Sequence, residues 1–493
     1  MLSRRKFLQV GGVAAAAAAI GCDQLPESIR DPLGFDDDAA SGPFRPPASS
    51  EIGIVSHALA RLSFGAPPGE WQRVRAMHAV EEHAVEHYVA EQLDPDSLRD
   101  RRAQRMGRRL ESLAAPLGEM YEYKEDFLLG EMTRGAVLRA TYSTRQLYEV
   151  MVQFWTDHFN IDSSKGDCRW LKAADDRDVI RAHALGKFPA MLRASALSPA
   201  MLWYLDGRVN RRNGAGDKPN ENYARELMEL HTLGVDGGYT QHDVMEVARA
   251  LTGWTVRSKD GSQLGIETVE FHPELHDDAE KVVLGTRIPA GLGEHDVEAV
   301  LDIVALHPST ARHIATKLCR RFIDDEPPAA AVASVAAAFQ GSGGDIRSTL
   351  RTLTATSAFA ESRGAKVKRP FEYVVSALRA TNADTDSGPA LTAYLSRMGH
   401  APFQYPTPDG YPSAPQPWLG TMLWRWNFAA ALSSNRIEGT RVNPASLVRA
   451  AGGDDALAAH LLGRRATEEE MLAYHQSGAG VALLLAAPAF MRS

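Results

Sequence analysis

The chain has 493 residues, of which 44% are hydrophobic and 24% charged, as is typical of a globular protein with a large core. Its formal net charge of -8 argues against non-specific binding to nucleic acid. Its three cysteines are too few for a disulfide framework or a cysteine metal cluster. One bridge between Cys168 and Cys319 is permitted in an oxidising compartment but is not required.

The first 22 residues have the pattern of a bacterial export signal. Ser3-Arg4-Arg5-Lys6-Phe7-Leu8 resembles the twin-arginine consensus, and an apolar run too short to remain as a membrane span follows it. Ala19-Ile20-Gly21-Cys22 is similar to a lipobox, although Ala19 departs from the usual leucine. We expect Cys22 to be lipidated; the alternative is cleavage at a small-x-small site, which leaves this thiol free. The signal, with Arg4 and Arg5 at its centre, predicts recognition by the twin-arginine export machinery.

Residues 23–50 are rich in proline, aspartate and serine and predict a disordered tether. Asp23 resembles the signal that keeps some lipoproteins on the inner membrane, so we expect a periplasm-facing lipoprotein held there through Cys22. Loss of the three basic signal residues leaves a net charge of -11, so lipid and not electrostatic attraction would hold the body at the membrane. We expect a main helical domain at 51–360 and a C-terminal helical subdomain or extension at 361–493.

Beyond the tether, apolar residues recur three and four positions apart, which predicts α-helices. The clearest helices are expected at 147–159, 222–232, 244–252, 297–306 and 371–381. Short strands are expected around 264–271 and 281–288. Because strands and helices do not alternate, the pattern disfavours a doubly wound sheet. The expected fold class is mainly α, a multi-helical bundle with helical hairpins and at most a short β-hairpin.

The segment 220–254 predicts a helical hairpin. Gly234 marks the end of the first helix, and Thr240 with Asp243 predicts a capping box for the second. The polar face of the first helix carries Asn222, Arg225 and Glu226. This face is either solvated, with charged pairs at helical spacing, or the lining of an interior polar site; the spacing alone favours the solvated face.

Two further segments carry candidate functional side chains. His158 lies on the apolar stripe of its helix, so it must find a hydrogen-bond partner or a metal inside the protein, and Asp157 beside it favours a polar pocket. The loop at 271–281 combines His276 and Asp277 with other carboxylates, a mixture that suits a divalent metal. Its spacing matches no standard metal motif, and a hydrophilic loop is the simpler interpretation.

The hairpin segment NENYARELMELHTLGVDGGYTQHDVMEVARALTGW closely resembles the signature of a bacterial family of exported proteins catalogued as domain of unknown function 1800. Further matching pieces, in chain order, are His57 to Gly65, Phe154 to Phe159, His276 to Gly285, Arg369 to Glu372, Pro406 to Pro412 and Trp418. The resemblance implies a mainly helical fold and export, and it supplies no established activity. The family's usual residue at His231 is aromatic, which implies that this histidine is a packing residue.

Two functions are consistent with these residues. In the first, a periplasm-facing enzyme gathers Asp157, His158, Asn222, Arg225, Glu226, His276 and Asp277, with a divalent metal as a candidate cofactor. Hydrolysis is the least specific reaction class; Glu226 would be its general base and Arg225 would bind an anionic group. In the second, a non-catalytic envelope protein docks another exported protein through its helical surface and the proline-rich loop at 402–417.

Overall fold

The computed structural model of the chain describes residues 42–212, 218–256 and 269–493. The predicted signal, with Arg4, Arg5 and Cys22, lies outside the described residues. Of the predicted tether, residues 42–50 are described. They run along the folded body, where Phe44 is buried, donates its amide hydrogen to the Ala450 carbonyl at 3.0 Å and packs on His460. The chain therefore joins the body several residues before the predicted end of the tether.

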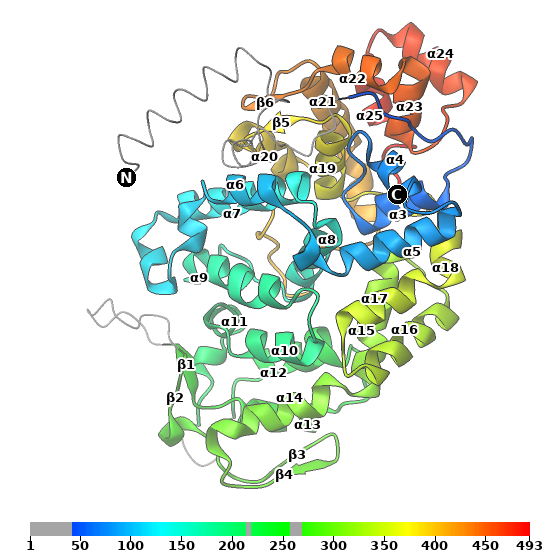
Figure 1. Cartoon of the computed structure of the whole chain (residues 1–493). Helices are drawn as coiled ribbons and strands as arrows, with labels where there is room; N and C mark the ends of the chain where they lie inside the picture. The colour runs from blue at the N-terminus through cyan, green and yellow to red at the C-terminus, as the bar shows by residue number, and fades with distance from the viewer. Residues whose placement is uncertain (1–41, 213–217, 257–268) are drawn as a thin grey trace, which may run out of the picture.

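The structure confirms the mainly α fold (Figure 1). The first helices are α3 (Ile54–Leu62), α4 (Glu70–Arg75), α5 (Glu81–Gln92), α6 (Arg101–Gly107), α7 (Glu125–Tyr142) and α8 (Gln146–His158). The middle of the chain forms α9 (Cys168–Asp175), α10 (Phe188–Ala196), α11 (Pro199–Tyr204), α12 (Asn222–Glu226), α13 (Gln241–Ala250), α14 (Asp296–Ala305), α15 (Pro308–Phe322), α16 (Ala329–Gly341), α17 (Ile346–Thr354) and α18 (Ser357–Glu361). The last helices are α19 (Pro370–Ala380), α20 (Pro389–Arg397), α21 (Met422–Ser433), α22 (Pro444–Ala451), α23 (Asp454–Leu462), α24 (Glu468–Ser477) and α25 (Val481–Ala486).

Two helices continue as wider π-helical turns. The segment η5 (Asp176–Arg181) extends α9, and η7 (Leu227–Thr232) extends α12. The helix predicted at 222–232 is therefore present with a change of pitch at Leu227. Such π turns are rare and are frequent at functional sites.

The β structure is three small antiparallel pairs. They are β1 (Trp254–Val256) with β2 (Val269–Phe271), β3 (Lys281–Val283) with β4 (Thr286–Ile288), and β5 (Asp384–Thr385) with β6 (Thr440–Arg441). The region predicted as one strand at 281–288 is a hairpin that turns at Leu284 and Gly285, both at positive φ. Residues 264–268 of the other predicted strand lie outside the described residues.

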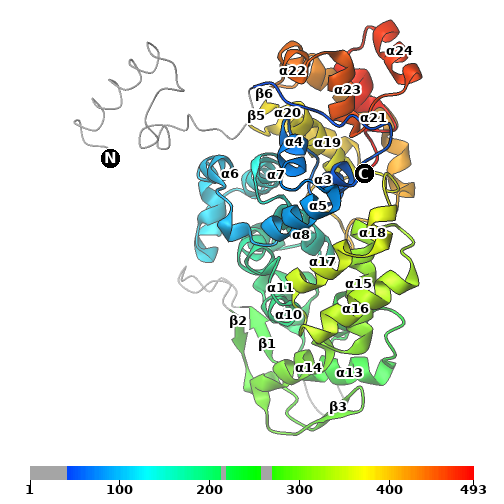
Figure 2. The same ribbon diagram turned by 45° about the vertical axis from the view of Figure 1, so that its right-hand side comes forward.

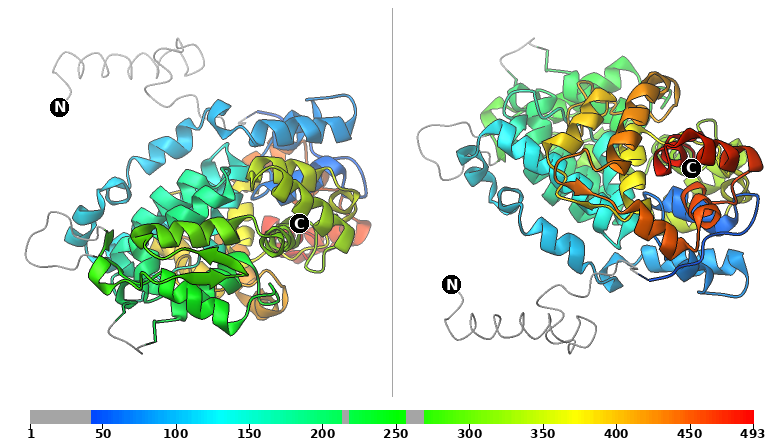
Figure 3. Two further views of the ribbon diagram at one scale, coloured as in Figure 1. Left: turned by 90° about the horizontal axis from the view of Figure 1, so that it is seen from below. Right: turned by 90° about the horizontal axis from the view of Figure 1, so that it is seen from above.

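The molecule is elongated. Helices α13 and α14 and the strands β1 to β4 lie at one end, and α22 to α24 lie at the other (Figure 2). The first helices α3 to α5 lie beside the C-terminal helices, and views from below and above show the two ends in turn (Figure 3). In the described part of the chain, no helix has the length and apolar character needed to cross a membrane.

One large hydrophobic cluster includes residues from Phe44 to Met491, on both sides of the boundary predicted after residue 360. Cys168 and Cys319 are both buried within it as free thiols, so the permitted bridge between them is not formed. Burial raises the pKa of each thiol to about 12.

Candidate functional site

The C-terminal end of α8 lies in a polar interior. Oδ2 of Asp157 accepts a charged hydrogen bond from Nη1 of Arg369 at 2.6 Å, and Nε of Arg369 donates to Glu372 at 3.1 Å. Burial is the largest influence on Asp157 and raises its pKa, in spite of the guanidinium beside it. Glu372 is also buried, but Arg321 and Arg369 outweigh that burial and hold its pKa at about 2. Asp157 is thus the carboxyl group of this cluster whose charged form is less favoured.

Lys317, on α15, is a second cation whose charge acts on Asp157. Burial lowers the pKa of Lys317 to about 8, while the charges of Asp157 and Asp409 oppose the shift. Among the described residues its ammonium group has no hydrogen bond or ion pair. A lysine of this kind changes protonation close to neutral pH, which is a property of proton-transfer residues.

Two histidines, His158 and His313, cap the end of η7, which itself carries a third, His231. Helix carbonyls near a C-terminus lack partners within the helix, and here imidazoles supply them. Nε2 of His158 donates to the His231 carbonyl at 3.1 Å, and Nε2 of His313 donates to the Leu230 carbonyl at 3.1 Å. Burial lowers the pKa of His158 well below its usual value, that of His231 to about 3 and that of His313 to about 4. All three rings are therefore neutral at neutral pH.

The proline-rich loop at 402–417 closes over the end of α8. Nδ2 of Asn160 donates to the carbonyls of Tyr405 at 2.9 Å and Thr407 at 2.8 Å, and the Tyr204 hydroxyl donates to the Pro406 carbonyl at 2.9 Å. Gly410 approaches so closely that a Cβ there would overlap the carbonyl oxygen of Asp157. Beside this contact, Asp157 and Asn160 line a small cavity of about 50 Å³.

The polar face of α12 lies at the rim of this region. The Asn222 amide donates to the Leu205 carbonyl at 3.0 Å, and Arg225 pairs with Glu221 at 3.0 Å and donates to Gln241 at 2.9 Å. Glu226 is partly buried, and burial, followed by the charge of Glu229, raises its pKa. Asp409 also acts on Glu226, so one loop carboxylate influences both Glu226 and Lys317.

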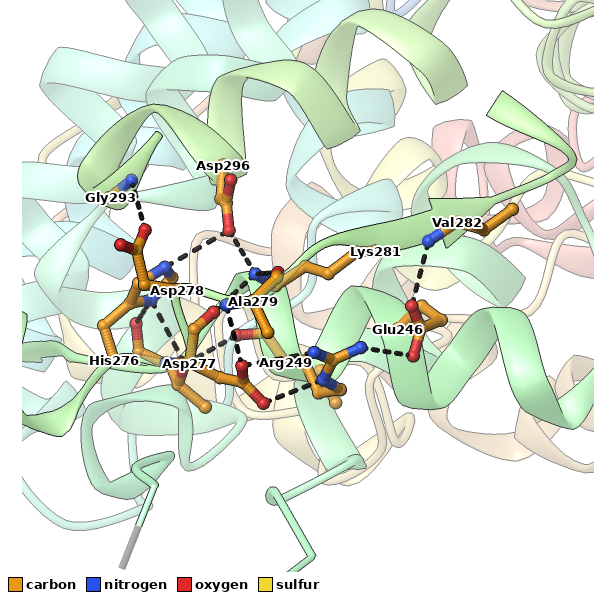
Figure 4. A network of polar contacts seen from close by, with 12 residues as sticks. Glu246, Arg249, His276, Asp277, Asp278, Ala279, Lys281, Val282, Gly293 and Asp296 are labelled. Carbon is orange, nitrogen blue, oxygen red and sulfur yellow. Dashed lines mark hydrogen bonds and ion pairs between the residues drawn. The ribbon is translucent and has the colours of Figure 1, made fainter. Parts of the chain in front are cut away.

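His276 and Asp277 belong to a different network at the strand-bearing end of the molecule (Figure 4). Both ring nitrogens of His276 face oxygen: Nδ1 lies 2.9 Å from the Thr252 carbonyl and Nε2 lies 3.2 Å from Asp296. Asp296 also binds Lys281, and Asp277 binds Nε of Arg249 at 2.8 Å. Arg249 in turn binds Glu246, which accepts the amide hydrogen of Val282. These contacts hold the β3–β4 hairpin against α13 and the start of α14.

The structure thus brings some of the predicted site residues together and leaves others apart. Asp157 and His158 share the end of α8, and Asn222, Arg225 and Glu226 share α12. No contact joins either group to His276 or Asp277. Within residues 42–212, 218–256 and 269–493, no three histidine, cysteine or acidic side chains are placed to hold one metal ion. His158, His276 and Asp277 therefore do not fit a common metal.

Sequence reasoning did not single out Lys317, and it noted Arg369 and Asp409 only as parts of the family resemblance. Lys317 sits in an ordinary amphipathic helix, where a lysine normally reaches solvent. Its environment is unusual because the fold buries it near the charges of Asp157 on α8 and Asp409 in the loop.

Comparison with known protein families gives a match between residues 57–492 and the family model described as "Protein of unknown function (DUF1800)". The match confirms the resemblance found in the sequence. Neither the curated proteins nor the solved structures contain a match to the chain.

Proposed function

The chain belongs to this DUF1800 family, and we propose that it is an exported, membrane-tethered enzyme that works at the end of α8. Export and tethering rest on the signal features Arg4, Arg5 and Cys22 in the sequence. The enzymatic part rests on one arrangement: Glu226 and Lys317, from separate helices, both respond to the charge of Asp409. Their pKa values move toward neutrality from opposite directions, as in acid and base pairs of enzymes.

In the proposed reaction, the two groups divide the proton transfers of a hydrolysis. Glu226, at the rim, takes a proton from the attacking water. Lys317, still largely protonated at neutral pH, gives a proton to the leaving group. Arg225 lies on the same face of α12 as Glu226 and binds an anionic part of the substrate, and Asp157 with Arg369 fixes the end of α8 beside Lys317.

The test is a panel of chromogenic carboxylic esters, phosphate esters and glycosides, assayed with the full chain after native export. Glu226→Gln and Lys317→Met are each expected to lower turnover of the active substrate about a hundredfold or more. Glu86→Gln, which makes the same change at an exposed carboxylate on α5, is the control and should have little effect. Turnover that is unaffected by both substitutions would contradict the proposed site.

A second candidate function has its own supporting observation. Leu419, Met422, Leu423 and Trp426 are exposed large apolar residues on and just before α21, at helical spacing and close in sequence to the proline-rich loop. Apolar residues gathered in this way are typical of protein interaction surfaces. In this case, the protein is an envelope protein that docks another exported protein through α21.

Crosslinking in living cells distinguishes the docking function. A photoreactive residue at Leu423 should form a defined adduct with one exported protein, and the same residue at Leu472, equally apolar and exposed on α24, should not. Absence of an adduct at Leu423, or equal adducts at both positions, would contradict docking through α21.

A further inference from the structure

A second and larger cavity, of about 540 Å³, lies between α6, α7, α8 and η5. This volume is in the range of small-molecule sites. Its lining is unusual in charge. Five arginines and three acidic residues face it: Arg108, Arg139, Arg145, Arg177, Arg181, Asp100, Glu149 and Asp176. The lining is therefore cationic, although the protein as a whole is acidic.

The three acidic residues are already engaged by other groups. Arg181 binds both oxygens of Glu149, at 3.1 and 2.9 Å, and Asp176 at 3.0 Å. Asp100 accepts from the Ser143 hydroxyl at 2.8 Å and the Thr144 amide at 2.9 Å. Glu149 and Asp176 are thus held by Arg181 and Asp100 caps a backbone turn, so none of the three forms an ion pair with another arginine of the cavity in the described chain.

Of the remaining arginines, Arg177 has a full complement: Nε and Nη2 donate to Asp178 at 2.7 Å, and Nη1 donates to the carbonyls of Leu113 at 3.2 Å and Ala115 at 2.8 Å. Arg145 donates from Nε and Nη2 to the Leu98 carbonyl at 3.4 and 3.2 Å, and its ion pair with the exposed Asp96, at 3.9 Å, is weak. Arg139 lies on α7 and lines the cavity with no ion pair or hydrogen-bond partner for its guanidinium among the described residues. The charge of Arg181, together with burial, lowers the pKa of Arg139. Asp176 and Glu149 oppose this shift, but both are held by Arg181, so an anion in the cavity would stabilise the charge of Arg139 further.

We propose that this cavity binds a small anionic ligand with a phosphate or carboxylate group, held chiefly by Arg139 with Arg145 and Arg108 near it. A guanidinium presents paired N–H donors that match the oxygens of either group. The segment η5 contributes to this cavity at both of its ends. Asp176 and Arg181 line the cavity together with Glu149 of α8. The same three residues also line the small cavity beside Asp157, so the two cavities share a wall.

Isothermal titration of the full chain tests the site. Inorganic phosphate, succinate and glycerol 3-phosphate are titrated separately, so that a free phosphate, a carboxylate and a phosphate on a larger molecule are distinguished. Arg139→Gln should weaken binding of the preferred anion at least tenfold, and Arg139→Lys should retain part of it. Arg312→Gln on α15 makes the same charge change at an exposed position and is the control.

The melting temperature distinguishes anion binding by Arg139 from a purely structural role of this residue. Since Arg139 lacks a partner in the described chain, Arg139→Gln should keep the melting temperature of the unliganded protein or raise it; a lower melting temperature with unchanged anion binding would overturn the proposal. Arg145→Gln provides a second variant of the site. Absence of binding by all three anions at concentrations up to about 10 mM would also overturn it. Because Glu226 and Lys317 lie outside this cavity, loss of turnover in their variants leaves the anion site unaffected, and each proposal can fail alone.

Discussion

Nη1 of Arg369 lies 2.6 Å from Oδ2 of Asp157, although 212 positions separate the two residues along the chain. The pair joins the start of α19 to the end of α8, on opposite sides of the boundary predicted after residue 360. Both side chains are largely buried, with 7% and 18% of their surface exposed. The C-terminal helices are thus attached to the earlier part of the chain by a buried ion pair as well as by apolar packing.

Removal of one member of that pair should destabilise the protein strongly. Asp157→Ala leaves the buried charge of Arg369 with Glu372 alone, and we expect a loss of about 3 kcal/mol in the free energy of unfolding. Denaturant unfolding measures the loss. Asp236→Ala, at an exposed carboxylate, should cost less than about 0.5 kcal/mol; equal effects of the two substitutions would show that the pair does not contribute to stability.

Lys317 should make stability rise with alkaline pH. Its pKa is about 8 in the folded protein and 10.5 when exposed, so between these values the unfolded chain binds more protons and folding gains stability as pH increases. Relative to Lys317→Met, the wild-type protein should gain up to about 3 kcal/mol from pH 8 to 10.5. Lys124→Met, at an exposed lysine, should leave the slope unchanged. Unfolding curves at four or five pH values measure it, and parallel curves for wild type and Lys317→Met would contradict the shift.

His231 should contribute to acid sensitivity. Its pKa falls from 6.5 to about 3 on folding, so the unfolded chain takes up a proton below pH 6.5 while the folded protein does not. Stability is therefore lost as pH falls. His231→Phe should lose about 3 kcal/mol less than wild type between pH 6.5 and 4. The exposed His242 provides the control as His242→Phe, which should follow the wild-type curve.

Gly410 should be intolerant of a side chain for two separable reasons. Its φ is +74°, and a Cβ there would overlap the backbone of Asp157. Gly399 has φ +73° and nothing near the position of a Cβ. Gly399→Ala should therefore cost about 1 kcal/mol from backbone strain, and Gly410→Ala at least about 2 kcal/mol. Thermal unfolding compares them, and equal losses would argue against close contact between the loop and α8.

Localisation provides a further prediction. Cys22→Ser should abolish incorporation of radiolabelled palmitate and release the protein from the membrane fraction. Replacement of Arg4 and Arg5 by lysine together should leave unprocessed protein in the cytoplasm. Cys168→Ser keeps the lipidation site and should behave as wild type in fractionation. Palmitate labelling that persists in Cys22→Ser would place the lipid elsewhere.

The sequence predicted those features that depend on local patterns. All five of the clearest helices form, and Thr240 and Asp243 make the predicted capping box, with the Thr240 amide 2.8 Å from the carboxylate of Asp243. Periodicity and capping act over a few residues, so the sequence displays them directly. The β5–β6 pair was missed because each strand has two residues and the strands lie far apart in the chain.

The candidate sites depend on contacts that the sequence does not display. The low pKa of Lys317 follows from its burial in the fold, and the setting of Arg139 follows from the packing of α6, α7, α8 and η5 around one cavity. No periodic signal marks either one. The predicted metal ligands show the opposite case, in which the sequence indicates a site that the fold does not form. His276 lies in a loop whose composition suits a metal, but its ring nitrogens face Thr252 and Asp296, and Asp296 also binds Lys281 (Figure 4).

The burial of Cys168 and Cys319 has a consequence for the way in which this protein can be made. A thiol reacts with oxidants and other thiols as its thiolate, and both groups here are kept protonated and inside the core. The described body therefore needs neither a reducing nor an oxidising compartment to keep its covalent structure. It can fold in one redox environment and serve in another without assistance from thiol oxidases or isomerases.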